Sequence, residues 1–311
     1  MSEPTSPKPP LSKSQIFVRR LGSTLLLWTV ILVAMFSGNR FVSDGVFLLL
    51  IAFLALSGLV EFYGMAEKRG LACFKICGVI GGLLLMVGTF LNVTGHLGTA
   101  NGSPSRVNDF ETGFLILFVL GLCVRQLFSK ANAAGLVAIS TTLFGLMYVP
   151  WLLNFIQKIN FFPFAPGTSP DAGKYFLCYF ILLTKFSDMG AYAIGSILGR
   201  HKMIPRISPA KTWEGFCGAI LVSTGASVAF VHFFGAKMAG MNYLHAVILG
   251  VILSIAAVIG DLIESLFKRE AGVKDSGALF PGIGGILDLL DSLLFNAPIM
   301  YLYLRHIITH P

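Results

Sequence analysis

The sequence predicts an all-α polytopic membrane protein with about nine transmembrane helices and a cytosolic N-terminus. Of its 311 residues, 55% are apolar and 12% are charged, whereas about 25% of the residues in a soluble domain are charged. Apolar runs recur along the whole chain at roughly the 20-residue length that a helix needs to cross a bilayer. This composition excludes a disordered chain, a collagen and a coiled coil.

The formal net charge of +8 bears on the partners that the chain can have. In a soluble protein such an excess would suggest a nucleic-acid partner, but in a membrane protein it is typical of basic loops gathered on one side. We therefore expect no nucleic-acid partner. An odd number of cysteines beside apolar segments predicts packing residues, not a disulfide framework; they are Cys73, Cys77, Cys123, Cys178 and Cys217.

The chain begins with a polar segment, residues 1–20, that contains four prolines and predicts a disordered cytosolic tail. No small-residue cleavage site follows a short apolar core, so we expect a first spanning helix in place of a removed signal peptide. Polar residues and Gly or Pro breaks bound the predicted spans. These spans are residues 21–36, 43–63, 73–92, 113–128, 133–153, 174–198, 212–234, 243–265 and 284–308.

The distribution of Lys and Arg supports nine spans. The tail and the loops between these spans place 16 of the 23 Lys and Arg residues on the N-terminal side of the membrane and six on the opposite side. The remaining one, Lys185, lies inside a span. Because cations concentrate in cytosolic loops, the N-terminal side is predicted to be the cytosol.

The two halves of the chain differ in their charged residues. Residues 21–160, with about five helices, carry scattered charges such as Glu61, Glu67 and Asp109 that form no cluster typical of a site. We interpret this half as a scaffold with lipid-binding surface. Residues 174–311, with about four helices, hold the candidate catalytic region and its cytosolic loops, 199–215 and 266–285.

Asp188 is a candidate because a charge within a span is costly. Lys185 lies three residues earlier on the same helical face, so the two residues predict either a structural ion pair or part of a site. The helix runs from outside to inside, which places Asp188 in its cytosolic half.

Two acidic stripes approach the same membrane face. Residues spaced by three and four positions share one face of a helix, and carboxylates paired with hydroxyls are ligands suited to Mg²⁺. The first stripe is Asp261, Glu264, Ser265 and Lys268, and the second is Asp288, Asp291 and Ser292.

Two loops add groups suited to phosphate. The segment GVKDSGALFPGIGG, residues 272–285, has five glycines, which let backbone amides approach an anion. In the other loop, residues 199–215, Ser208 and Pro209 predict the cap and the first residue of a helix. Lys211, Thr212 and Glu214 would then lie near the N-terminus of that helix, where phosphate binds favourably. Neither a P-loop nor a dinucleotide-binding GxGxxG motif is present in the sequence.

Several short motifs follow one another along roughly the last 130 residues. They are Asp188 with Ala191 and Tyr192, Gly199 with Arg200, SPAKTWEG (208–215), SLFKREAGVKDSG (265–277), PGIGG (281–285) and DLLD (288–291). This set resembles the signature of the phosphatidate cytidylyltransferases, also called CDP-diacylglycerol synthases. The chain departs from the family pattern at Ile283 and Leu289, where His and Arg are usual.

The resemblance implies that CTP and phosphatidate give CDP-diacylglycerol and pyrophosphate, with Mg²⁺ as cofactor and a second cation as an option. It implies three groups of site residues. The expected metal ligands are Asp188, Asp261, Asp275, Asp288 and Asp291; the catalytic residues are Lys211, Lys268, Arg269, Lys274 and Asp275; the substrate-binding residues are Ser208, Thr212, Glu214, Ser265, Gly282, Gly284 and Gly285.

The expected setting is the bacterial cytoplasmic membrane, with the site facing the cytosol and membrane lipid as a partner. Gly-rich faces, including Gly78, Gly190 and Gly195, predict close helix packing or a homodimer. Two other functions remain open: a CTP-dependent transferase or kinase acting on an isoprenoid lipid, and an ion-coupled secondary transporter. A non-catalytic membrane protein is a third reading, which rests on Ile283 and Leu289.

Overall fold

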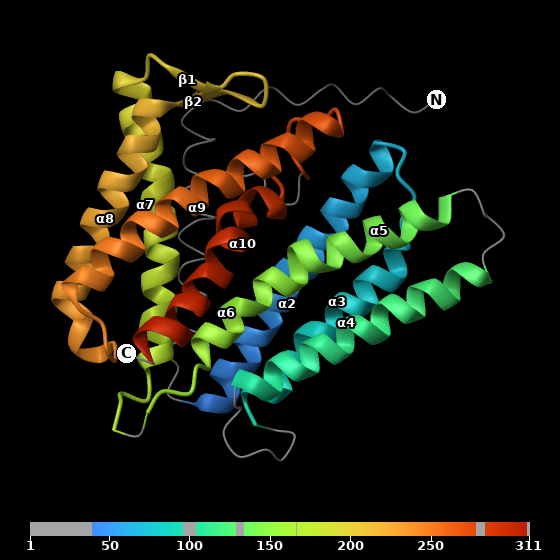
Figure 1. The fold of residues 1–311 in the computed structure, drawn as a ribbon, viewed down its shortest axis with the longest axis horizontal. Coiled ribbons are helices and arrows are strands. Elements are labelled where there is room, and N and C mark those ends of the chain that lie inside the picture. Colours follow the sequence, from blue (N-terminus) through green and yellow to red (C-terminus); the bar gives the residue numbers. More distant parts are fainter. Residues whose placement is uncertain (1–38, 96–103, 129–133, 166, 278–283, 310–311) are drawn as a thin grey trace, which may run out of the picture.

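The computed structural model describes residues 39–95, 104–128, 134–165, 167–277 and 284–309. Within these residues, eight helices are long and apolar enough to cross a membrane, so the chain is a helical integral membrane protein (Figure 1). In order, the elements are α2 (Arg40–Lys68), α3 (Lys75–Val93), α4 (Pro104–Leu127), α5 (Gly135–Leu146), η2 (Met147–Trp151), α6 (Leu152–Asn160), α7 (Ala172–Leu198), β1 (Lys202–Ile204), β2 (Ser208–Thr212), α8 (Trp213–Phe234), η3 (Gly235–Lys237), α9 (Tyr243–Glu270), α10 (Ile286–Tyr303) and η4 (Leu304–Ile308).

These helices confirm eight of the nine predicted spans. The first predicted span, 21–36, and the tail, 1–20, lie outside the described residues. The helices α5 and α6 form one span, Gly135–Asn160, which passes through a π-helical turn that contains Pro150. Such a turn accommodates a proline, which has no amide hydrogen to donate. No disulfide forms among the cysteines in the described part of the chain; Cys73, Cys77 and Cys178 are partly buried, as expected for packing residues, whereas Cys123 and Cys217 are exposed.

Helix α4 begins nine residues before the predicted start at 113, because its acidic residue Glu111 is paired inside the bundle. The Glu111 carboxylate lies 2.6 Å from Lys158 Nζ, and the two side chains are 4% and 3% exposed. Trp151 Nε1 donates to the same carboxylate at 3.1 Å, and Asn154 donates to Thr89 at 2.8 Å. Charges that appear scattered in the sequence of the first half therefore meet in a buried pair.

In the C-terminal half, α7, α8, α9 and α10 pack on one another, and α10 also contacts α2 and α6. Close approach of α7 and α8 depends on glycine, since a Cβ on Gly190 would lie 2.6 Å from the Gly218 carbonyl oxygen. The predicted close packing at Gly190 is thus confirmed, and it occurs between two helices of the same chain. Helix α10 is the most enclosed of the eight spans.

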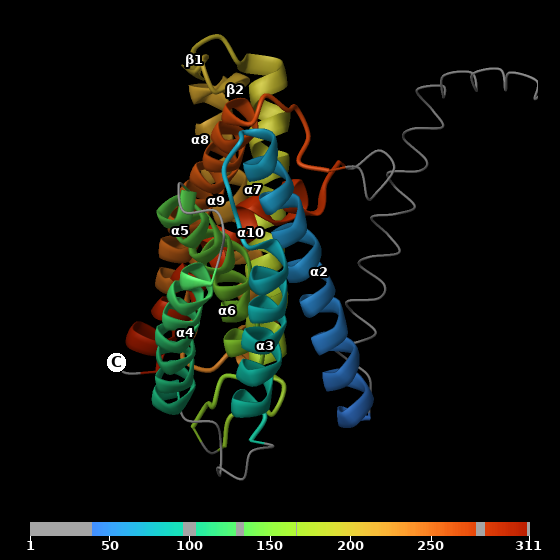
Figure 2. The same ribbon diagram turned by 90° about the vertical axis from the view of Figure 1, so that its right-hand side faces the viewer.

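A β-hairpin at one end of the bundle was not predicted (Figure 2). Its antiparallel strands pair Lys202 with Thr212 and Ile204 with Ser208. Ser208 therefore starts a strand and does not cap a helix, which corrects the prediction for Ser208 and Pro209. Helix α8 begins at Trp213, where the Thr212 hydroxyl accepts a hydrogen bond from the Gly215 amide at 3.1 Å.

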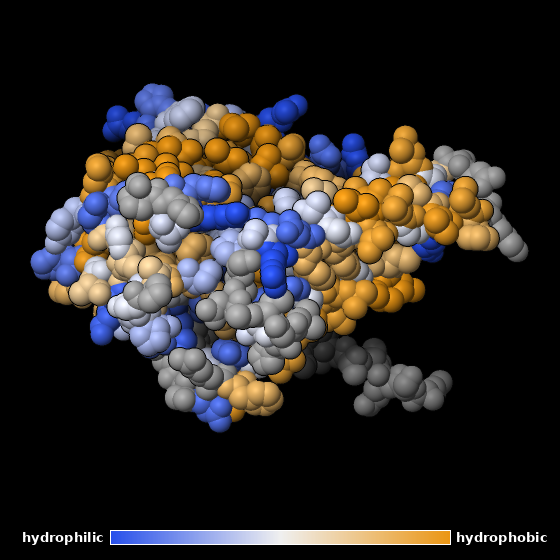
Figure 3. Space-filling view, turned by 60° about the horizontal axis from the view of Figure 1, so that its bottom comes forward, coloured by the Kyte–Doolittle hydropathy of each residue, from blue (hydrophilic) through white to orange (hydrophobic). Residues whose placement is uncertain are grey.

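The surface fits a protein that crosses a bilayer. Figure 3 turns the end opposite the hairpin toward the viewer, where polar residues gather beside broad apolar flanks. Exposed apolar side chains on these flanks come from several helices, as expected where lipid takes the place of water. Examples are Leu49, Ile76, Leu117, Leu136 and Leu221.

Candidate active site

A pocket of about 700 Å³ lies between the hairpin and the neighbouring ends of α7, α8, α9 and α10. Its lining combines acidic and basic side chains that are distant in the sequence. The acidic residues are Asp188, Asp261, Asp288 and Asp291, and the basic residues are Lys202, Lys211 and Lys268. Such a mixture suits a polyanionic substrate bound together with a cation.

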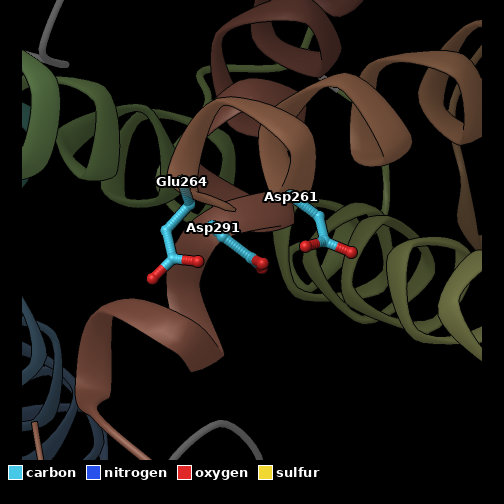
Figure 4. A group of neighbouring side chains, drawn as sticks. All are labelled: Asp261, Glu264 and Asp291. Carbon is cyan, nitrogen blue, oxygen red and sulfur yellow. The ribbon is translucent and has the colours of Figure 1, made fainter. Parts of the chain in front are cut away.

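Three carboxylates form a compact cluster at this pocket. Oxygens of Asp261, Glu264 and Asp291 all lie within 4.8 Å of one another. Figure 4 shows Asp261 and Glu264 on α9 and Asp291 on α10, with their side chains on one side of α9. Glu264 is fully buried and Asp291 is 8% exposed. Carboxylates this close repel one another unless cations or protons compensate.

Lysines compensate part of this negative charge. Lys211 Nζ lies 2.8 Å from Asp261, and Lys268 contacts Glu264 while lying 2.6 Å from Asp288. Lys185 Nζ lies 3.6 Å from Asp188 on α7, and Asp188 also lines the pocket, so the ion pair and a place at the site, which were predicted as alternatives, occur together. The Ser292 hydroxyl links Asp188 to α10 at 3.4 Å.

Asp288 lies at the start of α10 and has several partners. Its Oδ1 accepts from Lys268 at 2.6 Å. Its Oδ2 accepts from the Gly285 amide at 2.8 Å and from Ser276, by the amide at 3.2 Å and the hydroxyl at 3.0 Å. Asp288 therefore caps the helix and orders the loop before it, beside the three-carboxylate cluster.

The hairpin is fixed by two charged side chains outside the pocket lining. The Glu214 carboxylate accepts from the Arg200 and His201 amides at 3.2 Å and lies 2.6 Å from His201 Nδ1. Arg269 Nε donates to the Ile207 carbonyl at 3.2 Å. These contacts tie the hairpin to α8 and to the end of α9.

Eight of the site residues named from the sequence line the pocket, namely Asp188, Ser208, Lys211, Thr212, Asp261, Lys268, Asp288 and Asp291. Ser265 lies beside it and donates to Asp261 at 3.4 Å, while Gly284 and Gly285 directly precede α10. Lys274 and Asp275 are exposed and form no hydrogen bond or ion pair with the described part of the chain. Gly282 and Ile283 lie outside the described residues.

Sequence reasoning missed three features of the site. Glu264 lies on the predicted acidic stripe but is not among the expected metal ligands, although its spacing from Asp261 is a signal for that role. Lys202 lines the pocket because the hairpin, which was not predicted, brings it there. Glu61 contacts Ser276 across 215 positions of sequence, a separation for which a single sequence holds no signal.

Comparison with known proteins bears on the identity of the chain. A model of the cytidylyltransferase family matches residues 20–307. A phosphatidate cytidylyltransferase of Haemophilus influenzae is 42% identical over 130 residues, which are 42% of this chain and 45% of that protein. One from Mycobacterium bovis is 35% identical over 159 residues, 51% of this chain and 48% of that protein.

An uncharacterised protein of Escherichia coli K12 is 35% identical over 165 residues, 53% of this chain and 51% of that protein. The chain spans about half the length of the curated relatives it matches. The family model, in contrast, extends from the first predicted span to the last helix. On this match and the motifs of its C-terminal half, the protein belongs to the cytidylyltransferase family.

Proposed function

We propose that this protein is a membrane-embedded nucleotidyltransferase that converts CTP and phosphatidate into CDP-diacylglycerol and pyrophosphate for phospholipid biosynthesis. The observation that carries the proposal is the cluster of Asp261, Glu264 and Asp291 in a chain of the cytidylyltransferase family. Asp261 and Asp291 of this cluster line the pocket together with Lys211 and Lys268. Relatives named phosphatidate cytidylyltransferase support the choice of lipid substrate. Family membership favours this transferase over an ion-coupled transporter.

The carboxylate cluster fits a divalent cation. Its donors are all oxygens, they lie within 4.8 Å of one another, and Glu264 is excluded from solvent. Mg²⁺ prefers carboxylate and phosphate oxygens, so Asp261, Glu264 and Asp291 would hold it, with Asp188 available to a second cation. When bound, Mg²⁺ neutralises and orients phosphate oxygens.

The reaction needs little proton transfer from the protein. A phosphomonoester has its second pKa near 6, so the phosphatidate headgroup is already a nucleophile at neutral pH. One of its oxygens bonds to the α-phosphorus of CTP, the bond from that phosphorus to the bridging oxygen breaks, and pyrophosphate leaves. Lys211 and Lys268 would contact phosphate oxygens and stabilise the charge that develops on the leaving group.

The remaining predicted residues have separate places in this proposal. Ser208 and Thr212 on the hairpin side and Gly284 and Gly285 before α10 would border the bound substrates. Arg269, Lys274 and Asp275 would act at the outer edge, where Lys274 and Asp275 have exposed side chains. The expected roles of Glu214 and Ser265 become indirect, through the hairpin and through Asp261.

We further propose that the site faces the cytosol of a bacterium, where CTP is available, and that the acyl chains stay in the cytoplasmic membrane. The basic loops 199–215 and 266–285 support this orientation. In this arrangement, residues 21–160 are the scaffold and 174–311 the catalytic region. A homodimer stays a prediction, and it would need faces other than Gly190, which packs on α8.

The test is incorporation of CMP from labelled CTP into lipid by the purified protein in detergent, with phosphatidate and Mg²⁺. We expect a lipid product that requires both, and a loss of at least about tenfold in Asp261→Asn. Asp171→Asn is the matched control, because Asp171 is a 47% exposed partner of Lys174 before α7, away from the pocket. Product formed only with isoprenoid phosphates or alcohols would overturn phosphatidate as the substrate.

A further inference from the structure

The first turn of α10 is held by a side chain from the N-terminal half. At the start of a helix the first amides have no partner within the helix. Glu61, on α2, supplies partners for two of them: its Oε1 accepts from the Ile286 amide at 3.0 Å and its Oε2 from the Leu287 amide at 2.9 Å. A carboxylate at this end also interacts favourably with the helix dipole.

The same carboxylate contacts the loop before α10. The Ser276 hydroxyl lies 2.9 Å from Glu61 Oε2 and 3.0 Å from Asp288 Oδ2, so it bridges the two acidic side chains by sharing its one proton between them. Asp288 in turn accepts from Lys268, which contacts Glu264. A continuous set of polar contacts therefore runs from α2 to the carboxylate cluster.

Two glycines of this loop leave the space that Glu61 occupies. A Cβ on Gly285 would lie 2.5 Å from Glu61 Oε2 and 2.6 Å from the Gly277 amide nitrogen. A Cβ on Gly277 would overlap Glu61 Oε1. Side chains at either position would force the carboxylate away from the start of α10. The geometry of the loop is thus matched to a glutamate on another helix.

We propose that Glu61 is a positioning residue for the carboxylate cluster, and the effect of this positioning on catalysis rests on the proposed function. It fixes the start of α10 and Ser276, and through them the placement of Asp288 and Asp291 relative to Asp261 and Glu264 on α9. Helix α2 belongs to the half interpreted from the sequence as scaffold, so this contact makes the scaffold part of the site's geometry. Glu61 itself does not line the pocket.

The first variant is Glu61→Gln, which keeps the size of the side chain but replaces one acceptor oxygen by an NH₂ group that faces amide donors. Glu67→Gln is the matched control: it lies on the same helix, in a half-exposed pair with Lys75. Three measurements are made on both variants and the wild type. They are the affinity for Mn²⁺ without substrate, hydrogen exchange of peptides from 284–295, and kcat and KM for CTP.

We expect Glu61→Gln to lower the Mn²⁺ affinity and kcat by about tenfold or more, the size of effect seen when a residue that orients a metal ligand is removed. KM for CTP should change less, and exchange at the start of α10 should become faster. Glu67→Gln should match the wild type in all three. If Glu61→Gln yields too little folded protein, Ser276→Ala removes only the bridging hydroxyl and should change the same three quantities in the same direction.

The outcomes separate this inference from the proposed reaction. If the wild type forms product and Glu61→Gln equals it in Mn²⁺ affinity, exchange and kcat, the positioning role is wrong and the reaction stands. If the wild type forms no product, while Glu61→Gln still loses Mn²⁺ affinity and protection of α10, the reaction is wrong and the positioning role stands. A loss of kcat explained fully by a lower folded fraction, with unchanged Mn²⁺ affinity, also overturns the positioning role.

Discussion

Glu264 occupies an unusual position for an ionisable residue, because it is fully buried at the edge of a membrane span. Its carboxylate contacts Lys268 and shares the cluster with Asp261 and Asp291. Bringing these acidic groups together without a cation is unfavourable. A group that costs stability in this way is expected at a site where it binds a ligand.

We therefore predict that Glu264→Gln weakens metal binding without destabilising the protein, because Lys268 keeps its ion pair with Asp288. In the wild type, Mg²⁺ should raise the melting temperature, because a ligand that binds only the folded state stabilises it. This rise should shrink in Glu264→Gln and persist in Glu270→Gln, an exposed residue at the end of the same helix. Thermal unfolding in detergent, with and without Mg²⁺, measures this rise in melting temperature. An equal rise in both variants would contradict a ligand role for Glu264.

At the scale of elements, helices were predicted well and the hairpin was not. Long apolar runs identify spans by their length alone, whatever they pack against. The segment Ser208 to Thr212, however, presents the same residues whether Ser-Pro opens a helix or starts a strand. Its strand character comes from pairing with Lys202 to Ile204, and the helix cap moves to Thr212. Such a choice depends on a tertiary contact, which local sequence signals do not contain.

The cap at Thr212 leads to a prediction for this element. The Thr212 hydroxyl accepts from the Gly215 amide and lies next to Lys211 at the end of β2. Thr212→Ala should destabilise the protein by about 1 kcal/mol and lower activity, because the strand that carries Lys211 loses its anchor. Thr212→Ser retains the hydroxyl and should restore both. Thermal unfolding and CMP transfer measure the two effects, and an alanine variant as stable and active as the serine variant would exclude the capping role.

At the scale of the whole molecule, the two halves are joined by polar contacts that span long stretches of sequence. Glu61 reaches the start of α10 from α2, and Glu111 of α4 pairs with Lys158 of α6. The acidic stripes of α9 and α10 were predictable because each lies within one helix, where spacing alone places residues on a face. Contacts between helices were not, since each partner appears in the sequence as an isolated charge.

The buried pair of Glu111 and Lys158 supports the last prediction, that the N-terminal half is held together by a charge pair that does not take part in the reaction. Breaking a buried pair leaves one charge without compensation and costs about 3–5 kcal/mol. Glu111→Ala should therefore lower the melting temperature strongly, whereas Glu67→Ala, which breaks the exposed pair with Lys75, should cost about 0–1 kcal/mol. The double variant Glu111→Gln with Lys158→Met removes both charges and should recover much of the loss.

Neither Glu111 nor Lys158 lines the pocket. At temperatures below its melting temperature, each variant should therefore have the wild-type activity per folded molecule. A Glu111→Ala protein as stable as Glu67→Ala would mean that the pair contributes no more than a surface contact, and a folded but inactive variant would extend the site into the N-terminal half beyond Glu61.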